Sequence, residues 1–529
     1  MCQIDRLRRC LPSSIRRVLN DLPEGLDETY SRTLLGIDRE KQEYARRLFQ
    51  CLTVSIRPLR VEELAEIFAV RFDESTRPIF NPDWRLADAN EAVLSACSSL
   101  ISIVSAAGYR VVQFAHFSVK EFLTSERLAN KNPPLSCYHI LPEPAHTTLA
   151  RACLSCLLHL DDKIDKDAIQ HFPIALYAAQ YWIDHARSSS VSSQIQDLME
   201  DLFDSSKPHF AAWVWLYDID HHWLDPMSER HPTQPSAMPL YYASLCGFRG
   251  LVERLIAAHP QDINARGGFH YTPMHAASAK GHFEIVQLLL SNNADPHLCA
   301  SDGNPPLHAA SRGGHVEVVK ILLDCGVDVS QRGMDGWTAL HYASCWGRVE
   351  VAQFLIQQGA VVDAFGDNQQ TALYETAFDL ELARLLINSG ASVNITEEDG
   401  WTPLLMAAWM GDCELVELLL ASGASLEVRN RSHETPLALA CREGRLEVSR
   451  FLIDRGLDVN SWDNYGYTPL HEASRHGHHD IAQLLLDHGA YVDSRNDKQQ
   501  TPLFLASWYG HVECARLLIA HGAGTSCQD

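Results

Sequence analysis

Hydrophobic residues in the second half of the chain fall in short amphipathic stretches that recur with a fixed period. The residue before each Pro-Leu, Ala-Leu or Pro-Met pair serves as a marker. The nine markers are Met238, Thr272, Pro305, Thr338, Thr371, Thr402, Thr435, Thr468 and Thr501. They are spaced 34, 33, 33, 33, 31, 33, 33 and 33 residues apart. Such a period predicts an array in which each repeat is one small supersecondary unit.

Each repeat predicts two short helices. The marker threonine caps the first helix, and proline follows at the first helical position, where its missing N–H is not needed. Glycine stands nine residues after the marker in eight of the nine copies, and it ends the first helix because it adopts a left-handed conformation at little cost. The second helix follows, as over 284–290. One helix pair has too little core to fold alone, so we expect a solenoid of nine stacked repeats with short hairpin-like loops.

Three departures from the repeat pattern generate further expectations. Pro305 replaces a capping threonine, which should cost its helix about 1 kcal/mol. The copy beginning at Thr371 lacks two residues and the glycine, which predicts a shortened first helix or turn and a kink near residues 374–381. The last copy has no polar capping repeat after Gly522 and Ala523, so either its end is poorly capped or the chain is shorter than its ancestor.

The repeats resemble a known family. Thr272-Pro273-Met274-His275-Ala276-Ala277 with Gly281-His282, and Thr468-Pro469-Leu470-His471 with Gly477-His478, are similar to ankyrin repeats. The resemblance covers residues 235–524 and implies the stacked helix pairs of that family.

The first 230 residues show no such period. Helical spacing of apolar residues over 39–52, 61–70 and 90–99 is followed by two strand-like runs at 100–104 and 109–114. Ser118 and Glu121 predict a capping box at the start of another helix. Helices followed by a hairpin suggest a winged-helix module. The expected domain boundaries are 1–50 for a helical segment, 51–130 for the winged-helix-like module, 138–230 for a helical connector and 235–524 for the repeats. The expected fold class is mainly α.

The N-terminal segments carry a second resemblance. Leu22 to Tyr30 and Phe114 to Leu123 are similar to the segment after the NACHT nucleotide-binding domain in fungal NACHT-ankyrin proteins of the STAND signalling class. In that family a G-x-x-x-x-G-K-[S/T] loop binds nucleotide, but this chain contains no Gly-Lys pair. The resemblance therefore implies a regulatory module without its nucleotide-binding motor. Whether the chain is a part of a longer receptor stays open.

The charge disfavours nucleic acid as a partner. The formal net charge is −23, and residues 236–529 contribute −16 of it, from 19 basic and 35 acidic side chains. Nonspecific affinity for a phosphate backbone comes from Lys and Arg, and the helix expected before the hairpin, over 88–100, has two acids and neither cation. A transcriptional regulator acting through the winged-helix-like module stays as the alternative hypothesis.

The cysteine content and hydropathy indicate a reduced compartment. The chain has fifteen cysteines, an odd number that cannot pair completely within one molecule. They are also too sparse in so long a chain for a disulfide scaffold. No apolar run has the length of a membrane-spanning helix. We expect a cytoplasmic or nuclear location and no membrane partner.

No catalytic motif is recognisable, so we expect a protein that is not an enzyme and has no cofactor. Cys153, Cys156 and His159 lie at helical spacing, but a second ligand pair is lacking, which favours buried structural cysteines over a metal site. Histidines three residues after the marker are expected to form structural hydrogen bonds. They are His275, His308, His341 and His471.

Aromatic residues recur at two places in the repeat. Seven or eight residues after the marker stand Trp346, Trp409, Met410, Trp508 and Tyr509, and directly before the marker stand Tyr271, Trp337, Trp401 and Tyr467. Trp and Tyr dominate interface hot spots because they bury a large area with few rotatable bonds. We therefore predict a non-enzymatic scaffold or sensor that binds a protein through an aromatic, acidic concave face and the loop tips. The alternative is that these rings pack loops against neighbouring repeats.

Overall fold

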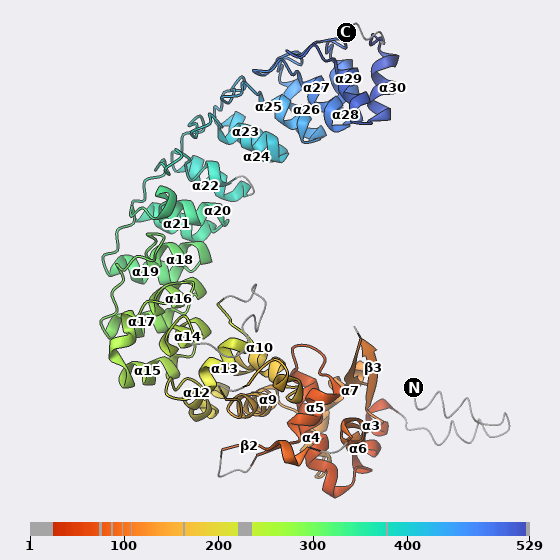
Figure 1. The fold of residues 1–529 in the computed structure, drawn as a ribbon, viewed down its shortest axis with the longest axis vertical. Coiled ribbons are helices and arrows are strands. Elements are labelled where there is room, and N and C mark those ends of the chain that lie inside the picture. The colour runs from red at the N-terminus through yellow and green to blue at the C-terminus, as the bar shows by residue number, and fades with distance from the viewer. Residues whose placement is uncertain are drawn as a thin grey trace, which may run out of the picture. The chain divides into compact units, whose positions relative to one another are not determined.

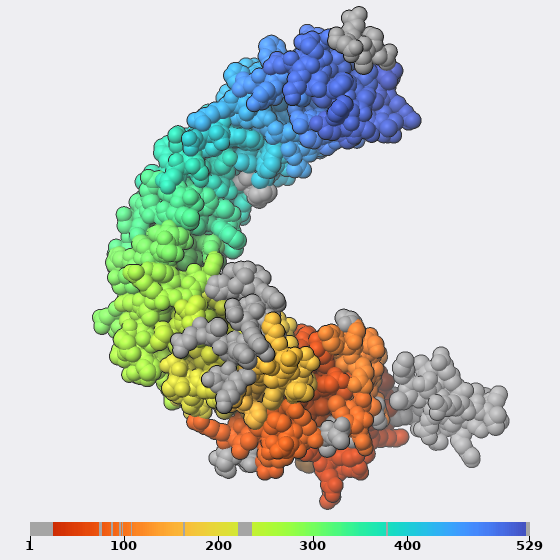
Figure 2. All heavy atoms as spheres, in the orientation of Figure 1, coloured from red at the N-terminus to blue at the C-terminus, as the bar shows by residue number. Residues whose placement is uncertain are grey.

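A computed structural model describes residues 25–72, 77–85, 88–97, 99–106, 108–161, 164–220, 235–376 and 379–524. The chain divides into two compact units, Met1–Pro273 and Met274–Asp529 (Figures 1 and 2). The predicted segments over 1–50 and 138–230 therefore lie partly outside the described residues, at 1–24 and 221–230. The described fold is mainly helical, as the sequence predicted.

The N-terminal part of the first unit is a winged-helix arrangement. Its elements are α3 (Leu26–Leu35), η2 (Arg39–Lys41), α4 (Gln42–Val54), α5 (Val61–Ile67), β1 (Val70–Arg71), β2 (Ile79–Phe80), η3 (Pro82–Trp84), α6 (Ala89–Cys97), β3 (Ile101–Ala106), β4 (Tyr109–Phe114), α7 (Phe117–Leu123) and α8 (Glu126–Ala129). The predicted hairpin is β3 and β4, paired antiparallel with Ile103 opposite Val112. The cap of α7 differs from the prediction, because His116 rather than Ser118 accepts the capping bond, from the Ser118 amide.

A helical connector follows. Its elements are η4 (Leu135–Tyr138), α9 (Pro142–Leu157), η5 (Ala168–His171), α10 (Ala175–Ala186), α11 (Ser189–Gln194), α12 (Gln196–Leu202) and α13 (His209–Leu216). Trp182 and Trp213 meet edge to face at 5.7 Å in its core, and Phe248 of the first repeat stacks on Trp182 at 5.2 Å. The first repeat, α14 (Pro239–Cys246) and α15 (Arg249–Ala258), closes with η6 (Pro260–Asn264). This aromatic contact explains why the first repeat belongs to the first unit.

The remaining repeats form the second unit, one helix pair after another (Figure 1). The pairs are α16 (Pro273–Lys280) with α17 (Phe283–Ser291), α18 (Pro306–Gly313) with α19 (Val316–Asp324), α20 (Ala339–Cys345) with α21 (Val349–Gln357), η8 (Tyr374–Thr376) with α22 (Leu380–Asn388), α23 (Pro403–Met410) with α24 (Cys413–Ala421), α25 (Pro436–Arg442) with α26 (Leu446–Asp454), α27 (Pro469–His476) with α28 (His479–Asp487), and α29 (Pro502–Trp508) with α30 (Val512–Ala520). The turn η7 (Met334–Gly336) precedes α20.

The start and end of the first helices agree with the sequence prediction. Thr402, Thr435, Thr468 and Thr501 each accept a capping bond from the amide three residues on. Pro305 accepts none through its side chain, as expected. Gly411 has a φ of 90°, in the left-handed region that ends a helix and that glycine adopts without strain.

Hydrogen bonds between neighbouring repeats join the stack at two levels. At the first level, each bond runs from a His or Arg side chain, ten residues after the marker, to a carbonyl near the end of the first helix of the preceding repeat. The donor–acceptor distances are 3.0–3.2 Å. The donor and acceptor pairs are His315 and Ala279, Arg348 and Arg312, Arg445 and Trp409, His478 and Arg442, and His511 and Arg475. These bonds satisfy carbonyls that a helix end leaves without a partner.

At the second level, backbone bonds link the hairpin tips. The amide four residues before a marker donates to the carbonyl three residues before the preceding marker, at 2.7–3.0 Å. The pairs are Asp367 and Asp335, Glu398 and Asn368, Arg431 and Asp399, Asn464 and Ser432, and Asp497 and Tyr465. The tips therefore form a continuous ladder from the fourth repeat to the last.

The fifth repeat is the irregular one. Its first helix is reduced to the short turn η8, which confirms the predicted shortening, although residues 377 and 378 lie outside the described part. Asp379 caps α22 and Asp412 caps α24, each accepting an amide bond of 3.0 Å. Neither acid can donate to a helix-end carbonyl as His and Arg do elsewhere. Across this repeat the array continues through the second helices and the ladder of hairpin tips.

We expect Thr402→Ala to lower the free energy of unfolding by about 1 kcal/mol, because Thr402 is buried and its hydroxyl accepts the Leu405 amide. Urea unfolding of the full chain measures the change as a lower midpoint with an unchanged slope. The matched control, Thr402→Ser, keeps the accepting oxygen and should lose much less. Equal midpoints for the alanine and serine variants would show that the cap contributes nothing.

Candidate partner-binding surface

The predicted aromatic residues after the marker lie at the ends of the first helices. Trp346, Trp508 and Tyr509 are 53%, 73% and 50% exposed, whereas Trp409 and Met410 are half-buried. Together with three arginines at equivalent positions, they form what we call the first-helix face. Its residues are Arg312, Trp346, Trp409, Met410, Arg442, Arg475, Trp508 and Tyr509.

The aromatic residues directly before the marker behave differently. Trp337 stacks on His341 at 5.9 Å and meets Tyr342 edge to face at 5.3 Å. Tyr467 lies 5.8 Å from His471 of its own repeat. These rings are half-buried against the helix that they precede, which is the packing alternative considered from the sequence.

Trp401 stands directly before its marker but contacts a residue of the first-helix face, because its ring meets that of Trp409 edge to face at 6.4 Å. Tyr271 lies in the first unit, with the Arg266 guanidinium 5.1 Å from its ring. Packing therefore accounts for Trp337 and Tyr467, and exposure singles out Trp346, Trp508 and Tyr509.

Arginine side chains lie beside the aromatic rings of the first-helix face. Arg312 lies 6.0 Å from the Trp346 ring, and Arg475 lies 5.8 Å from Tyr509. Arg442 forms ion pairs with Glu434 and Glu443. Many of the array's acids lie in the first turn of the second helices, where the helix dipole favours negative charge. These acids are Glu284, Glu317, Glu350, Glu381, Glu414, Glu447, Asp480 and Glu513.

One carboxyl beside the face is buried. Glu472 of α27 is 9% exposed, and burial raises its pKa to about 7, although Arg475 and Arg442 act in the opposite direction. On the same helix, the Nε2 atom of His476 lies 3.6 Å from Glu472 Oε2. Burial also raises the pKa of Glu375, in η8, to about 7. Both positions stand four residues after a marker, a place the sequence analysis did not single out.

The recurrent histidines form structural hydrogen bonds, as predicted, and these bonds join neighbouring repeats. His275, His341 and His471 each donate from Nε2 to the carbonyl of the residue before the next marker, at 3.0–3.2 Å. His308 donates to the Gln331 carbonyl at 3.0 Å. Burial lowers the pKa of His275, His308 and His471 to about 4. These groups are therefore neutral structural donors at neutral pH.

The hairpin tips present exposed apolar residues that the sequence analysis missed. They are Met334, Phe365, Trp462 and Tyr465. Arg332 donates to the Phe365 carbonyl at 2.9 Å, and Arg429 donates to the Trp462 carbonyl at 3.0 Å. Phe365 and Trp462 both stand six residues before a marker. An aromatic residue at this fixed place in an otherwise polar loop is the signal that would have found them.

The cysteines of α9 are buried, as predicted. Burial raises the pKa of the Cys153 and Cys156 thiols well above their usual range. The ring of His159 packs edge to face on Phe80 at 5.4 Å. Among the residues that the structure describes, no three His, Cys, Asp or Glu side chains lie close enough together to hold a metal ion. In the same part of the chain, no helix is both long enough and apolar enough to cross a bilayer.

Comparison with protein families decides the identity of the array. Profiles of ankyrin repeats match residues 219–298, 240–333, 274–366, 411–496 and 466–529, and a related ankyrin profile matches 371–420. These matches cover more than half of the chain. It is an ankyrin-repeat protein.

The part of this ankyrin-repeat protein before the repeats matches a different family. The winged helix domain of GPI inositol-deacylase matches residues 31–132, which include α4 as well as the β3–β4 hairpin. The match begins earlier than the boundary expected at residue 51.

Similar proteins cover only parts of the chain. The azaphilone pigments biosynthesis cluster protein L of Monascus ruber is 34% identical over 293 residues, which are 52% of this chain and 61% of that protein. The human ankyrin repeat domain-containing protein 49 is 31% identical over 93 residues, 16% of this chain and 39% of that protein. The chain thus spans less than two thirds of the length of these relatives.

The buried histidines predict that acid destabilises the ankyrin array. The folded pKa of about 4 lies below the ordinary 6.5, so the unfolded chain takes up protons that the folded chain excludes, and stability falls as the pH drops from 6.5 towards 4. The loss is on the order of 2 kcal/mol per histidine at about pH 5. Thermal unfolding of the full chain between neutral pH and pH 5 should show a falling midpoint.

His308→Gln isolates one of these histidines. The variant should be less stable than the natural chain at neutral pH, since the bond to Gln331 is disturbed, and the gap should narrow on acidification. A gap that stays constant with pH would contradict the buried neutral state of His308.

Proposed function

We propose that this ankyrin-repeat protein is a non-enzymatic scaffold or sensor that binds a protein partner through its first-helix face and hairpin tips. Ankyrin repeats in general imply protein partners. The observation that carries the proposal is the exposure of Trp346, Trp508 and Tyr509. Large aromatic side chains left in solvent are costly and are typical of interfaces.

The chemistry of the face defines the kind of partner. Arg312 beside Trp346 and Arg475 beside Tyr509 place guanidinium groups next to exposed rings. Such pairs combine apolar contact with a preference for anions. We therefore propose a partner segment that carries apolar side chains interspersed with Asp or Glu. Electrostatic repulsion from the acidic second helices would direct such a segment to this face.

The winged-helix elements support a regulatory rather than a nucleic-acid-binding role. Helix α6, which precedes the hairpin, has Glu91 in its first turn and no Lys or Arg. Arg110 on the hairpin donates to Glu62 at 2.7 Å and to Asn90 at 2.8 Å, so its charge is neutralised within the module. Binding to a phosphate backbone requires unpaired cations at these places.

We propose a role in signalling of the STAND class, which is supported by the resemblance of the N-terminal segments to NACHT-ankyrin proteins. The relative from Monascus ruber carries the name of a pigment biosynthesis cluster protein, and we propose pigment biosynthesis as a second setting for the same binding activity. We propose a cytoplasmic location for either role, with a nuclear one as the alternative.

The proposal is tested by comparing partner capture by variants of the full chain. Trp346→Ala and Trp508→Ala should each weaken the affinity for a captured partner at least about tenfold, or 1.4 kcal/mol, because hot-spot tryptophans carry a large share of binding energy. The measurement is quantitative pull-down from lysate followed by titration of the purified partner.

Tyr491→Ala is the matched control. Tyr491 is 69% exposed and lies in the turn after α28, away from the first-helix face. Its loss should leave the affinity unchanged. If the tryptophan variants bind as tightly as the control, the first-helix face is not the binding surface.

A further inference from the structure

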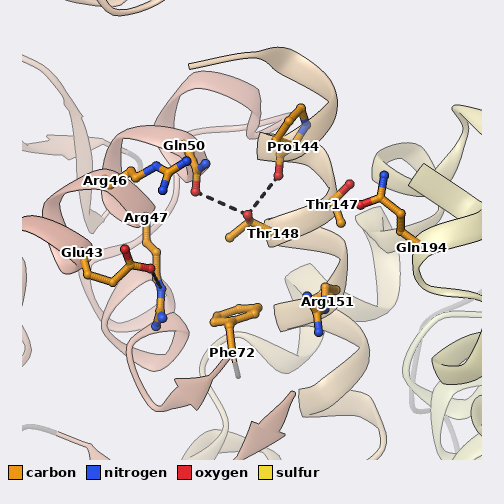
Figure 3. A pocket seen from close by; sticks show the side chains of 10 residues that line it. All are labelled: Glu43, Arg46, Arg47, Gln50, Phe72, Pro144, Thr147, Thr148, Arg151 and Gln194. Carbon is orange, nitrogen blue, oxygen red and sulfur yellow. Dashed lines mark hydrogen bonds and ion pairs between the residues drawn. The ribbon is translucent and has the colours of Figure 1, made fainter. Parts of the chain in front are cut away.

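A polar cavity lies within the first unit, between the winged-helix domain and the connector. It has a volume of about 250 Å³ and is formed by α4, α9, the end of α11 and Phe72 (Figure 3). Because one wall comes from each part, the cavity exists only when α4 packs on α9. Neither the repeats nor the winged-helix match accounts for it.

Three guanidinium groups line this cavity. Arg46 and Arg47 extend from α4 on one side, and Arg151 extends from α9 on the other (Figure 3). The Phe72 ring lies between them, with Arg47 4.6 Å and Arg151 5.8 Å from its centroid. The Phe72 ring therefore contacts two positively charged groups, Arg47 and Arg151, that lie on opposite walls of one cavity.

The positive charge of the cavity is only partly neutralised. Glu43 pairs with Arg47 at 3.0 Å. Arg46 and Arg151 form no ion pair with any residue that the structure describes. Burial lowers the pKa of Arg151, which shows that this guanidinium is partly removed from water without a carboxylate in compensation. Two of the three guanidinium groups that line the cavity thus lack a carboxylate partner in the described part of the chain, in a protein with a net charge of −23.

A buried amide also faces this region. Gln50 is 93% buried, and its Oε1 accepts a bond of 3.3 Å from the Thr148 hydroxyl. Its Nε2 donates to no residue in the described part of the chain. The same Thr148 hydroxyl lies 2.9 Å from the Pro144 carbonyl, so its single hydrogen is shared between two acceptors. Thr148 stands on α9, the wall that also carries Arg151. The Gln50 amide therefore borders the cavity, where a ligand oxygen can accept a hydrogen bond from it.

We propose that this cavity binds a small phosphate monoester, with the phosphate held by Arg46, Arg47 and Arg151 and a polar organic part against Gln50 and the threonine wall of α9. Guanidinium groups match phosphate oxygens in geometry and charge. The cavity lies near the lower limit for a small-molecule site, which selects a ligand the size of a sugar phosphate rather than a folded partner.

Binding of such a ligand would join the winged-helix domain to the connector, because its phosphate would contact both α4 and α9. A ligand that binds the assembled state and not the separated one stabilises the assembled state in proportion to its saturation. The inference does not depend on the proposed partner of the repeats.

Isothermal titration of the full chain with glucose 6-phosphate tests the proposal. We expect saturable binding at or below about 1 mM, weakened at least about tenfold by Arg151→Gln and by Arg46→Gln. Arg46 is exposed, so its variant is expected to fold even if the change at Arg151 disturbs packing. Arg187→Gln, which removes an exposed arginine at the end of α10, is the matched control and should leave the affinity unchanged.

Two further probes distinguish a small phosphate monoester from other anions that the arginines could bind. Inorganic sulfate should bind more weakly than glucose 6-phosphate, and equal affinity would overturn the proposal by showing nonspecific anion attraction. A phosphoserine peptide should also bind more weakly, because the cavity is too small for a chain on both sides of the phosphate. Tighter binding of the peptide, no binding of glucose 6-phosphate, or an equal loss in the Arg187→Gln control would each overturn it.

Discussion

The structure of the array depends on carbonyl groups that no single repeat can satisfy. Each first helix ends after two turns and leaves its last carbonyls without partners. In the regular repeats a His or Arg from the next repeat donates to one of them, as His478 does to Arg442 at 3.0 Å. The same donors pack against the left-handed glycine, for His478 lies where a side chain at Gly444 would stand. Stacking therefore satisfies helix-end carbonyls in these repeats as well as burying apolar surface.

This constraint explains how the surface divides into structural and free positions. Histidines near the start of the first helix are engaged in bonds to the next repeat, and aromatic residues such as Trp337 pack over them. The threonines at the same end cap their own helix. Residues at the end of the same helix face solvent, so Trp346 and Trp508 are left exposed. Acids collect in the first turn of the second helices, where the helix dipole stabilises them. The basic and aromatic first-helix face and the acidic second-helix side are consequences of one repeat geometry.

The fifth repeat shows what happens when the constraint is relaxed. The first helix of this repeat is reduced to η8, and Asp412 of the next repeat caps its own helix instead of donating. Continuity is then kept by the hairpin tips, where the Glu398 amide donates to the Asn368 carbonyl at 2.8 Å. The array can thus tolerate a lost helix because two independent sets of bonds join neighbouring repeats.

The sequence by itself determined the repeat register, the caps, the left-handed glycines and the shortened fifth copy, because these depend on residues close together in the chain. It also indicated the winged-helix hairpin from local alternation. Only the tertiary structure decided that Trp337 is packed and Trp346 exposed, that the first-helix face is basic, and that Arg46 and Arg151 share a cavity. Net charge and spacing carry no information about which side chains converge, since convergence is set by the packing of helices such as α4 and α9 that are distant in sequence.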